Sequence, residues 1–194
     1  VIKKNRRYLF MDSCLLDVKS VSEILGIDDV ALVSLVNSAE TRQLVVACDL
    51  EMRDLIMKYM ADKPETQMLF PSVVSDILGT RAKSSLEVRI FGLKDGVYQT
   101  EIYDQLTQRS FPIRCSDGIF FAIVCKLHIY ASAEVMRCHS IPYETFATKV
   151  GLPLTVLSDK LLKDSLQKAI ETENYEMASN LRDELNKRHK DKHE

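Results

Sequence analysis

The feature that most constrains the fold is the almost wholly apolar run at 118–127, GIFFAIVCKL, which follows a polar corner at 115–117. Its large apolar side chains cover most of a helix circumference, which is typical of a buried helix rather than a surface helix. These side chains are Ile119, Phe120, Ile123, Val124 and Leu127. An extended piece is expected before the corner, at 109–114, and a short strand after the run, at 128–131.

The corner brings polar side chains to the start of this buried helix. Ser116 is a natural N-cap, because its hydroxyl can accept from the free amides of the first turn. Asp117 suits the positive end of the helix dipole, and Arg114 directly precedes the corner. We therefore expect a site at Arg114, Ser116 and Asp117. The same residues also fit a plain helix cap and a structural pair between Arg114 and Asp117, so both interpretations stay open.

The rest of the first 144 residues alternates between strand and helix signals. Strands are predicted at 8–18, 30–36, 42–48, 86–90 and 97–103, and helices at 50–61 and 72–78. Asp49 should cap the first of these helices, and Gly79 should end the second. Two of the strand pairs are tight hairpins, one with the turn Lys94-Asp95-Gly96. This pattern predicts an α+β fold with a mixed, largely antiparallel sheet and a few packed helices.

The chain changes character near residue 158. From there it is strongly charged, and its apolar residues recur only at helical spacing, in stripes that a short break at 171–174 separates. The stripes are Leu162, Leu166, Ala169 and Ile170, then Tyr175, Ala178, Leu181 and Leu185. Two helices with so short a connection form an antiparallel αα-hairpin. We expect a first domain at 1–144, a linker at 145–157 and the hairpin at 158–194.

A hairpin of this size buries little surface by itself, so part of its apolar seam should dock elsewhere. The sequence therefore predicts a module that binds another protein, and an incomplete seam also makes homo-oligomers an open alternative.

Composition narrows the class of protein. The 194 residues carry a net charge of −2, which argues against the broad basic face that non-specific nucleic-acid binding needs, although a local patch would suffice for a specific site. No apolar run reaches the length of a membrane span, and no apolar signal core follows the basic start of the chain. Five cysteines without a CxxC pair suit reduced thiols. We expect a cytoplasmic protein without a membrane anchor.

Two stretches resemble known families. Residues 174–185, NYEMASNLRDEL, together with Ala169-Ile170, resemble the UVR motif, the helical hairpin through which excision-repair nuclease subunits recognise each other. The resemblance implies that the hairpin binds a protein partner, with Leu162, Leu166, Tyr175, Leu181 and Arg182 as the expected contact residues.

The region from about Tyr8 to Tyr143 resembles the bifunctional nuclease family, small α+β proteins associated with both DNA and RNA cleavage. The segment LKDGVY at 93–98 follows a strand, as in that family, and RCSDGI at 114–119 resembles its arginine, any residue, serine, aspartate, alanine signature. The segment HIY at 128–130 takes the place of its proline, isoleucine, tyrosine. Residues 44–51 roughly follow its apolar strand and glutamate-containing helix.

This resemblance implies phosphodiester hydrolysis assisted by Mg²⁺ or Mn²⁺. Glu51 and Asp117 would share the cation, Arg114 would clamp a phosphate, and Ser116 would hold a phosphoryl oxygen.

The sequence also departs from the family pattern. A histidine and two aspartates of the family correspond to Pro71, Ser72 and Pro112 here. The sequence is therefore consistent with two alternative functions. One is a nuclease acting on DNA or RNA, with activity reduced where those groups are missing. The other is a non-catalytic adaptor or regulatory protein that keeps the nuclease fold as a scaffold and binds a repair or protease complex through its hairpin. Glu51 also has an alternative role: instead of a metal ligand it would be a surface carboxylate that interacts favourably with the dipole of its helix.

Overall fold

A computed structural model describes residues 12–24, 27–143, 154 and 157–191 of the chain. The basic N-terminal residues, the start of the first predicted strand and most of the predicted linker lie outside these ranges. The chain divides into two compact units, one formed by 1–92 and 98–147 and the other by 93–97 and 148–194. None of the described helices combines the length and the hydrophobicity that a membrane crossing requires.

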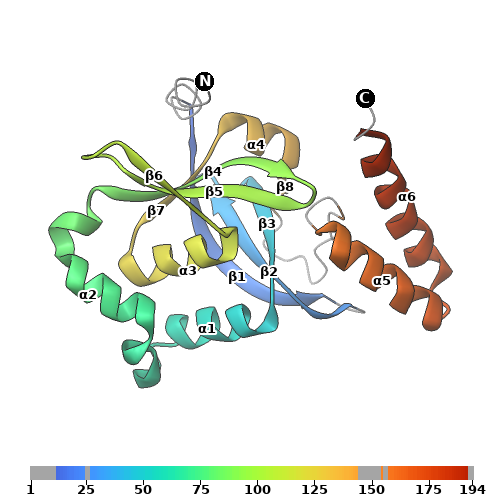
Figure 1. Cartoon of the computed structure of the whole chain (residues 1–194), viewed down its shortest axis with the longest axis horizontal. Coiled ribbons are helices and arrows are strands. Elements are labelled where there is room, and N and C mark those ends of the chain that lie inside the picture. Colours follow the sequence, from blue (N-terminus) through green and yellow to red (C-terminus); the bar gives the residue numbers. More distant parts are fainter. Residues whose placement is uncertain (1–11, 25–26, 144–153, 155–156, 192–194) are drawn as a thin grey trace. The chain divides into compact units, whose positions relative to one another are not determined.

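The first unit is built on a mixed sheet, which has eight strands within the described residues. They are β1 (Cys14–Ile24), β2 (Ile27–Asn37), β3 (Arg42–Cys48), β4 (Leu86–Lys94), β5 (Val97–Asp104), β6 (Arg109–Ile113), β7 (His128–Ala131) and β8 (Ile141–Pro142). Their order in the sheet is β6-β5-β4-β7-β1-β2-β3-β8 (Figure 1). Strand β4 pairs with β7 in parallel. Strand β1 pairs with both β7 and β2, β2 pairs with β3, and β3 pairs with β8, and all of these pairs are antiparallel. The predicted α+β class is confirmed.

Helices pack on this sheet. They are α1 (Leu50–Met60), the 3₁₀ helix η3 (Pro64–Met68), α2 (Phe70–Lys83), α3 (Cys115–Cys125) and α4 (Ala133–His139). Helix α3 packs against α1, α2, β3 and β7, and its side chains Ile119, Phe120 and Val124 are buried. The prediction of a central buried helix is therefore confirmed, and this helix fixes the position of the polar corner (Figure 1).

The start of α3 differs from the prediction. The helix begins at Cys115, and its N-cap is Arg114, whose side chain makes no capping bond. The amide of Gly118 donates to the carbonyl of Arg114, so the first helical turn already encloses Ser116. The prediction of Ser116 as the N-cap is wrong, because the residue lies inside the first turn and is 3% exposed.

Other boundaries also shift. The helical backbone of the first part of α2 does end at Gly79 as predicted, because Gly79 takes a φ of 65° and a ψ of 172°, and a second short helical segment follows this kink as far as Lys83. Between the predicted helices at 50–61 and 72–78 the structure adds η3, and α2 begins at Phe70. Helix α4 is not among the predicted elements, although Ser132 caps it by accepting from the amide of Val135.

The second unit contains two helices, α5 (Asp159–Glu171) and α6 (Tyr175–Asp191), which pack against each other as the predicted αα-hairpin. Ser158 caps α5 by accepting from the amide of Leu161 at 3.3 Å. The side chains of Leu162 and Leu181 are fully buried. The two apolar stripes therefore form the seam of the hairpin.

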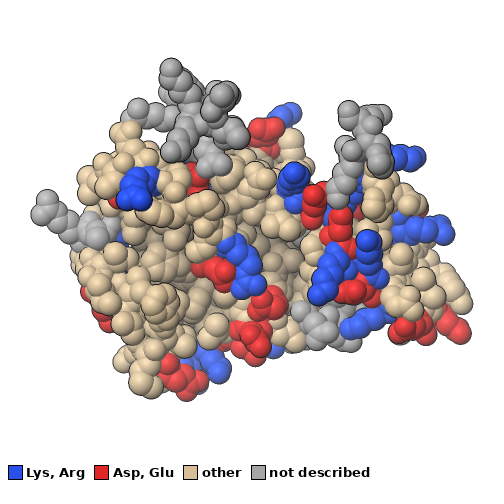
Figure 2. Space-filling view, in the orientation of Figure 1, with Lys and Arg blue, Asp and Glu red and all other residues tan. Residues whose placement is uncertain are grey.

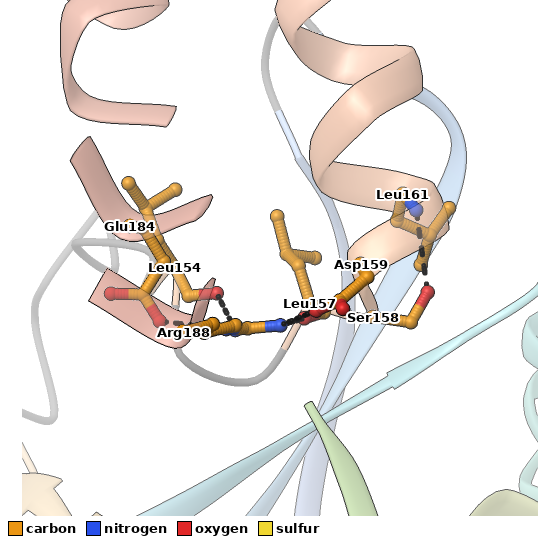
Figure 3. Close-up of polar contacts among 7 residues, drawn as sticks. All are labelled: Leu154, Leu157, Ser158, Asp159, Leu161, Glu184 and Arg188. Atoms are coloured by element: carbon orange, nitrogen blue, oxygen red, sulfur yellow. Dashed lines mark hydrogen bonds and ion pairs between the residues drawn. The ribbon is translucent and has the colours of Figure 1, made fainter. Parts of the chain in front are cut away.

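Arg188, near the end of α6, ties the chain before α5 to the hairpin (Figure 3). Its Nη1 donates to the carbonyl of Leu157 at 2.7 Å and its Nη2 to the carbonyl of Leu154 at 3.0 Å. It also forms ion pairs with Asp159, at 3.0 Å, and with Glu184, at 2.9 Å. One largely buried guanidinium thus satisfies two backbone carbonyls and two carboxylates.

Candidate active site

Three charged side chains meet at the start of α3. The Nε and Nη2 of Arg114 donate to the two carboxylate oxygens of Asp117, Oδ2 and Oδ1, both at 2.9 Å. The Nη1 of the same guanidinium donates to Oδ2 of Asp49 at 3.0 Å. The three side chains are 56%, 40% and 45% exposed for Arg114, Asp117 and Asp49. We call this group the Asp–Arg–Asp cluster; it is open to solvent and therefore to a substrate.

Each member of the cluster is positioned by the end of an element. Asp49 follows β3 and caps α1, since its Oδ1 accepts from the amide of Met52 at 2.7 Å. That bond occupies one carboxylate oxygen and leaves the other for Arg114. Arg114 lies between β6 and α3, and Asp117 lies in the first turn of α3. Because α1 packs against α3, residues 65 positions apart in the sequence meet here.

The electrostatics of the cluster keep the guanidinium charged. The hydrogen bonds and charge of Asp117, followed by the charge of Asp49, raise the pKa of Arg114 above its already high ordinary value. With both carboxylates ionised, two negative charges and one positive charge leave the cluster with one net negative charge. A cation would therefore be attracted to it, whereas a phosphate would need a cation as well as the arginine.

The structure brings together only some of the predicted site residues. Arg114 and Asp117 are paired, which is also the structural pairing considered from the sequence. Glu51 is exposed in the first turn of α1 and is not among the contacts of Arg114. Asp49 takes the place beside Arg114, and sequence reasoning identified it only as a cap. The signal for a second role was its residue type, because a carboxylate cap keeps one oxygen free.

Ser116 stands between Arg114 and Asp117 in the chain, but unlike their side chains it is buried, within the first turn of α3. Its expected contact with a phosphoryl oxygen stays a prediction.

An apolar pocket of about 560 Å³ adjoins the cluster, with Asp117 on its wall. Helices α1, α2 and α3 supply most of the lining, which includes Met52, Leu55, Phe70, Pro71, Phe120 and Phe121. Its size lies in the range of pockets that hold small molecules or single side chains. The pocket gives the cluster one apolar side, where electrostatic interactions are less screened than in bulk water.

The three residues that depart from the pattern of the resembled family lie in different surroundings. Pro71 lines the pocket. Ser72 is buried, and its hydroxyl donates to the carbonyl of Thr66 at 2.7 Å. Pro112 lies in β6, where it pairs with Glu101 of β5. Within the described part of the chain, no three His, Cys, Asp or Glu side chains form a group that could hold a metal ion.

The predicted partner-binding residues of the hairpin separate into two groups. Leu162 and Leu181 are fully buried, and Leu166 is half-buried. Tyr175 and Arg182 are exposed. Direct contact with a partner is therefore open to the exposed pair, whereas the buried leucines stabilise the seam.

In comparison with known protein families, the family described as the bifunctional nuclease domain matches residues 34–144 of the chain. The matched segment is more than half of the chain, and it includes all three members of the Asp–Arg–Asp cluster. No curated protein matches the chain.

Proposed function

The chain belongs to the bifunctional nuclease domain family, and from this premise we propose that it hydrolyses phosphodiester bonds of DNA or RNA at the Asp–Arg–Asp cluster. The observation that carries the proposal is the Arg114 guanidinium held between Asp49 and Asp117 on an exposed surface. Arginine and paired carboxylates are the groups that phosphoryl transfer requires, for charge stabilisation and for activation of water.

The residues present fit a Mg²⁺ or Mn²⁺ ion. Carboxylate oxygens are the donors that these cations prefer, and Mg²⁺ is commonly held by one or two carboxylates together with substrate phosphate and water. Asp117 and Asp49 would hold the ion together with substrate phosphate and water, whereas Glu51, the ligand expected from the sequence, does not join them in a metal-binding group of three within the described residues. A bound cation would supply Lewis-acid stabilisation of the phosphoryl oxygens.

Asp117 then has a second role besides holding the ion, and Arg114 binds the substrate. Asp117 is the proposed general base, since its carboxylate borders both the solvent and the apolar pocket. Arg114 binds a phosphoryl oxygen through its planar fork. Arg114 makes a single hydrogen bond to Asp49 but two parallel hydrogen bonds to Asp117. A phosphate would therefore displace Asp49 at a smaller cost in free energy than Asp117.

The test is cleavage of end-labelled single-stranded and duplex DNA and RNA by the purified full chain, with Mg²⁺, with Mn²⁺ and with a chelator. Asp117→Asn and Asp49→Asn should each lower the rate about a hundredfold or more. Asparagine is an equally good N-cap, so the second substitution preserves the start of α1. The matched control is Asp54→Asn, which removes an exposed aspartate of α1 that pairs with Arg53. Cleavage that survives Asp117→Asn undiminished rejects the site.

The alternative function is that of an adaptor. The observation in its favour is the α5–α6 hairpin, whose seam is closed by Leu162 and Leu181 while Tyr175 and Arg182 stay exposed. On this alternative the UVR-like hairpin binds a repair or protease complex. The test is binding to a purified excision-repair subunit that carries a UVR motif. Arg182→Glu should abolish binding without unfolding the hairpin, whereas an adaptor without nuclease function should show no cleavage under any metal condition.

A further inference from the structure

The apolar pocket beside the Asp–Arg–Asp cluster shares a residue with it. Asp117, which binds the fork of Arg114, also lies on the pocket wall. The other lining residues in the described part of the chain are all apolar, and Figure 2 shows that the surface over α2, which supplies part of the wall, is largely free of charged side chains. A ligand that reaches both places must therefore have a charged part for the cluster and an uncharged part for the pocket.

Aromatic rings line this pocket from two helices. Phe70 belongs to α2, and Phe120 and Phe121 belong to α3, which packs against α2. Phe70 is the first residue of its helix and is 79% exposed, so a ligand can contact its ring without a rearrangement of the core. Such rings favour a flat ligand, because aromatic groups gain from offset-stacked or edge-to-face contact.

A nucleotide has both parts that this site requires. Its phosphate carries the negative charge, and its base is a flat ring system that one sugar joins to the phosphate. A phosphate bound by Arg114 and a cation therefore brings an adjoining base to the wall that Asp117 shares with the cluster. Pockets of about 560 Å³ hold drug-sized ligands, so a base with its sugar fits here.

The shape and lining of the pocket favour an unpaired strand. In a duplex each base is paired and stacked, so it enters a pocket only after it has left the stack, which costs free energy. The bases of a single strand, in contrast, stack on aromatic side chains whatever their identity, because every base has a π-face. Apart from Asp117, no described lining residue has a polar side chain that could bind a base edge. All four bases should therefore be accepted.

We propose that the apolar pocket holds one unstacked base next to the scissile phosphate, which makes single-stranded DNA or RNA the preferred substrate. This inference rests on the proposed function, because the phosphate that orients the strand is the one bound at the Asp–Arg–Asp cluster. Phe70 is the main stacking residue, since its ring is both exposed and part of the pocket wall. It binds the substrate, whereas the hydrolytic step takes place at the cluster.

The first test measures kcat/KM of the full chain on an end-labelled single strand with one phosphodiester among phosphorothioate linkages. Two further strands each lack the base on one side of the cleavable bond, and one of these losses should lower kcat/KM about tenfold. Annealing to a complementary strand should lower it at least as much. Phe70→Ala should lower kcat/KM on the intact strand about tenfold and remove the difference between intact and abasic strands. Phe70→Trp, which keeps a ring, should restore both.

The matched control is Ile77→Ala, which alters an equally exposed apolar residue of the same helix outside the pocket lining. It should keep the wild-type kcat/KM on every strand. Circular dichroism and thermal unfolding verify that each variant is folded.

A second measurement reports binding without cleavage. The probe is a fully phosphorothioate single strand that alternates 2-aminopurine with thymine, in the presence of Mn²⁺. Stacking on Phe70 should quench the fluorescence of the bound 2-aminopurine. Phe70→Ala should remove this quenching and raise the dissociation constant about tenfold, whereas Ile77→Ala should change neither.

The base pocket and the nuclease function fail in different ways. Cleavage of intact and abasic strands at equal rates, or a preference for duplexes, overturns the base pocket and leaves the nuclease function standing. A chain that cleaves nothing rejects the nuclease function, and binding then decides the pocket. Quenching that depends on Phe70 supports the pocket in that case, and quenching that is absent or unchanged in Phe70→Ala overturns it.

Discussion

Arg114 and Asp117 bind each other through two parallel hydrogen bonds of 2.9 Å, one from Nε and one from Nη2 of the guanidinium. The two residues lie three positions apart at the start of α3, so the helix itself holds them in register. The remaining Nη1 reaches Asp49, which caps α1. The pair therefore links the starts of two helices that pack against each other.

The first prediction concerns Arg114→Lys. Lysine keeps the positive charge but cannot reproduce the planar fork, so it cannot bind both oxygens of Asp117 and reach Asp49 together. Because the residues are about half exposed, the free energy of unfolding should change by less than about 1 kcal/mol. Cleavage should fall about a hundredfold, since an oriented donor to the phosphate is lost.

Chemical denaturation and the nuclease assay, carried out on the same preparations, separate the two effects of Arg114→Lys. Arg53→Lys in α1 is the matched control, because Arg53 pairs with the exposed Asp54 outside the cluster. A lysine variant that cleaves at the wild-type rate would show that the fork has no part in the reaction.

Local signals predicted the elements better than they predicted the site. The apolar run at 118–127 identified a buried helix, and the turn at 94–96 identified the hairpin of β4 and β5, because both signals act over a few residues. The contact between Asp49 and Arg114 joins positions 65 residues apart and depends on the packing of α1 against α3. Periodicity and capping contain no information about that packing.

The start of α3 shows how neighbouring signals compete. Ser116 has the residue type of a cap, but the cap is Arg114, two residues earlier, and the helix begins at Cys115. Burial of Cys115 and Ser116 against the rest of the unit outweighs the local capping preference. Helix α4 was missed because its seven residues are too few to show a clear periodicity.

The second prediction compares two glycines with left-handed backbones. Gly96 has a φ of 74°, and a Cβ atom at this position would overlap the carbonyl oxygen of Leu157 in the second unit. Gly79 has a φ of 65°, but a Cβ atom there would enter open space. Gly79→Ala should cost roughly 1–3 kcal/mol of stability from backbone strain alone, because a φ of 65° with a ψ of 172° is a conformation that essentially only glycine adopts. Gly96→Ala should cost roughly 2–4 kcal/mol, because the steric overlap adds to the strain.

Urea denaturation of both variants measures this difference, with fluorescence and circular dichroism as independent probes. Equal losses of stability for the two substitutions would show that Leu157 does not approach Gly96 in solution.

The third prediction concerns Arg188→Met, which keeps the length of the side chain but removes its donors. The carbonyls of Leu154 and Leu157 and the carboxylates of Asp159 and Glu184 would all lose a partner. Because the arginine side chain is largely buried, the hairpin should lose roughly 2–4 kcal/mol. Hydrogen exchange of α5 and α6 is the measurement, since it reports opening of these helices separately from the first unit.

Arg182→Met is the matched control for that substitution, because Arg182 lies exposed on the same helix. It should leave exchange nearly unchanged. Similar acceleration of exchange in both variants would contradict the role of Arg188 as the tie between α6 and the chain before α5.

The last prediction concerns stability at alkaline pH. Burial raises the pKa of the Cys48 thiol to about 11 and that of Cys115 to about 12, from an ordinary value of 9.0. Below pH 9 both thiols stay protonated whether the chain is folded or unfolded, so their contribution to stability is fully present. Between pH 9 and these raised values only the unfolded chain loses the protons, and the free energy of unfolding falls as the pH rises. Each thiol contributes a slope of at most about 1.4 kcal/mol per pH unit.

The measurement is urea denaturation at several pH values from about 8 to about 10.5, with a reductant present. Cys115→Ala should lower stability at every pH, because it leaves a small cavity, but it should flatten the dependence on pH. Combination with Cys48→Ala should flatten it further. Cys138→Ser, at an exposed cysteine, is the control and should keep the wild-type slope. An unchanged slope in the double variant would show that the two thiols are not buried in the folded protein, and would place the start of α3 and the end of β3 closer to solvent than the structure does.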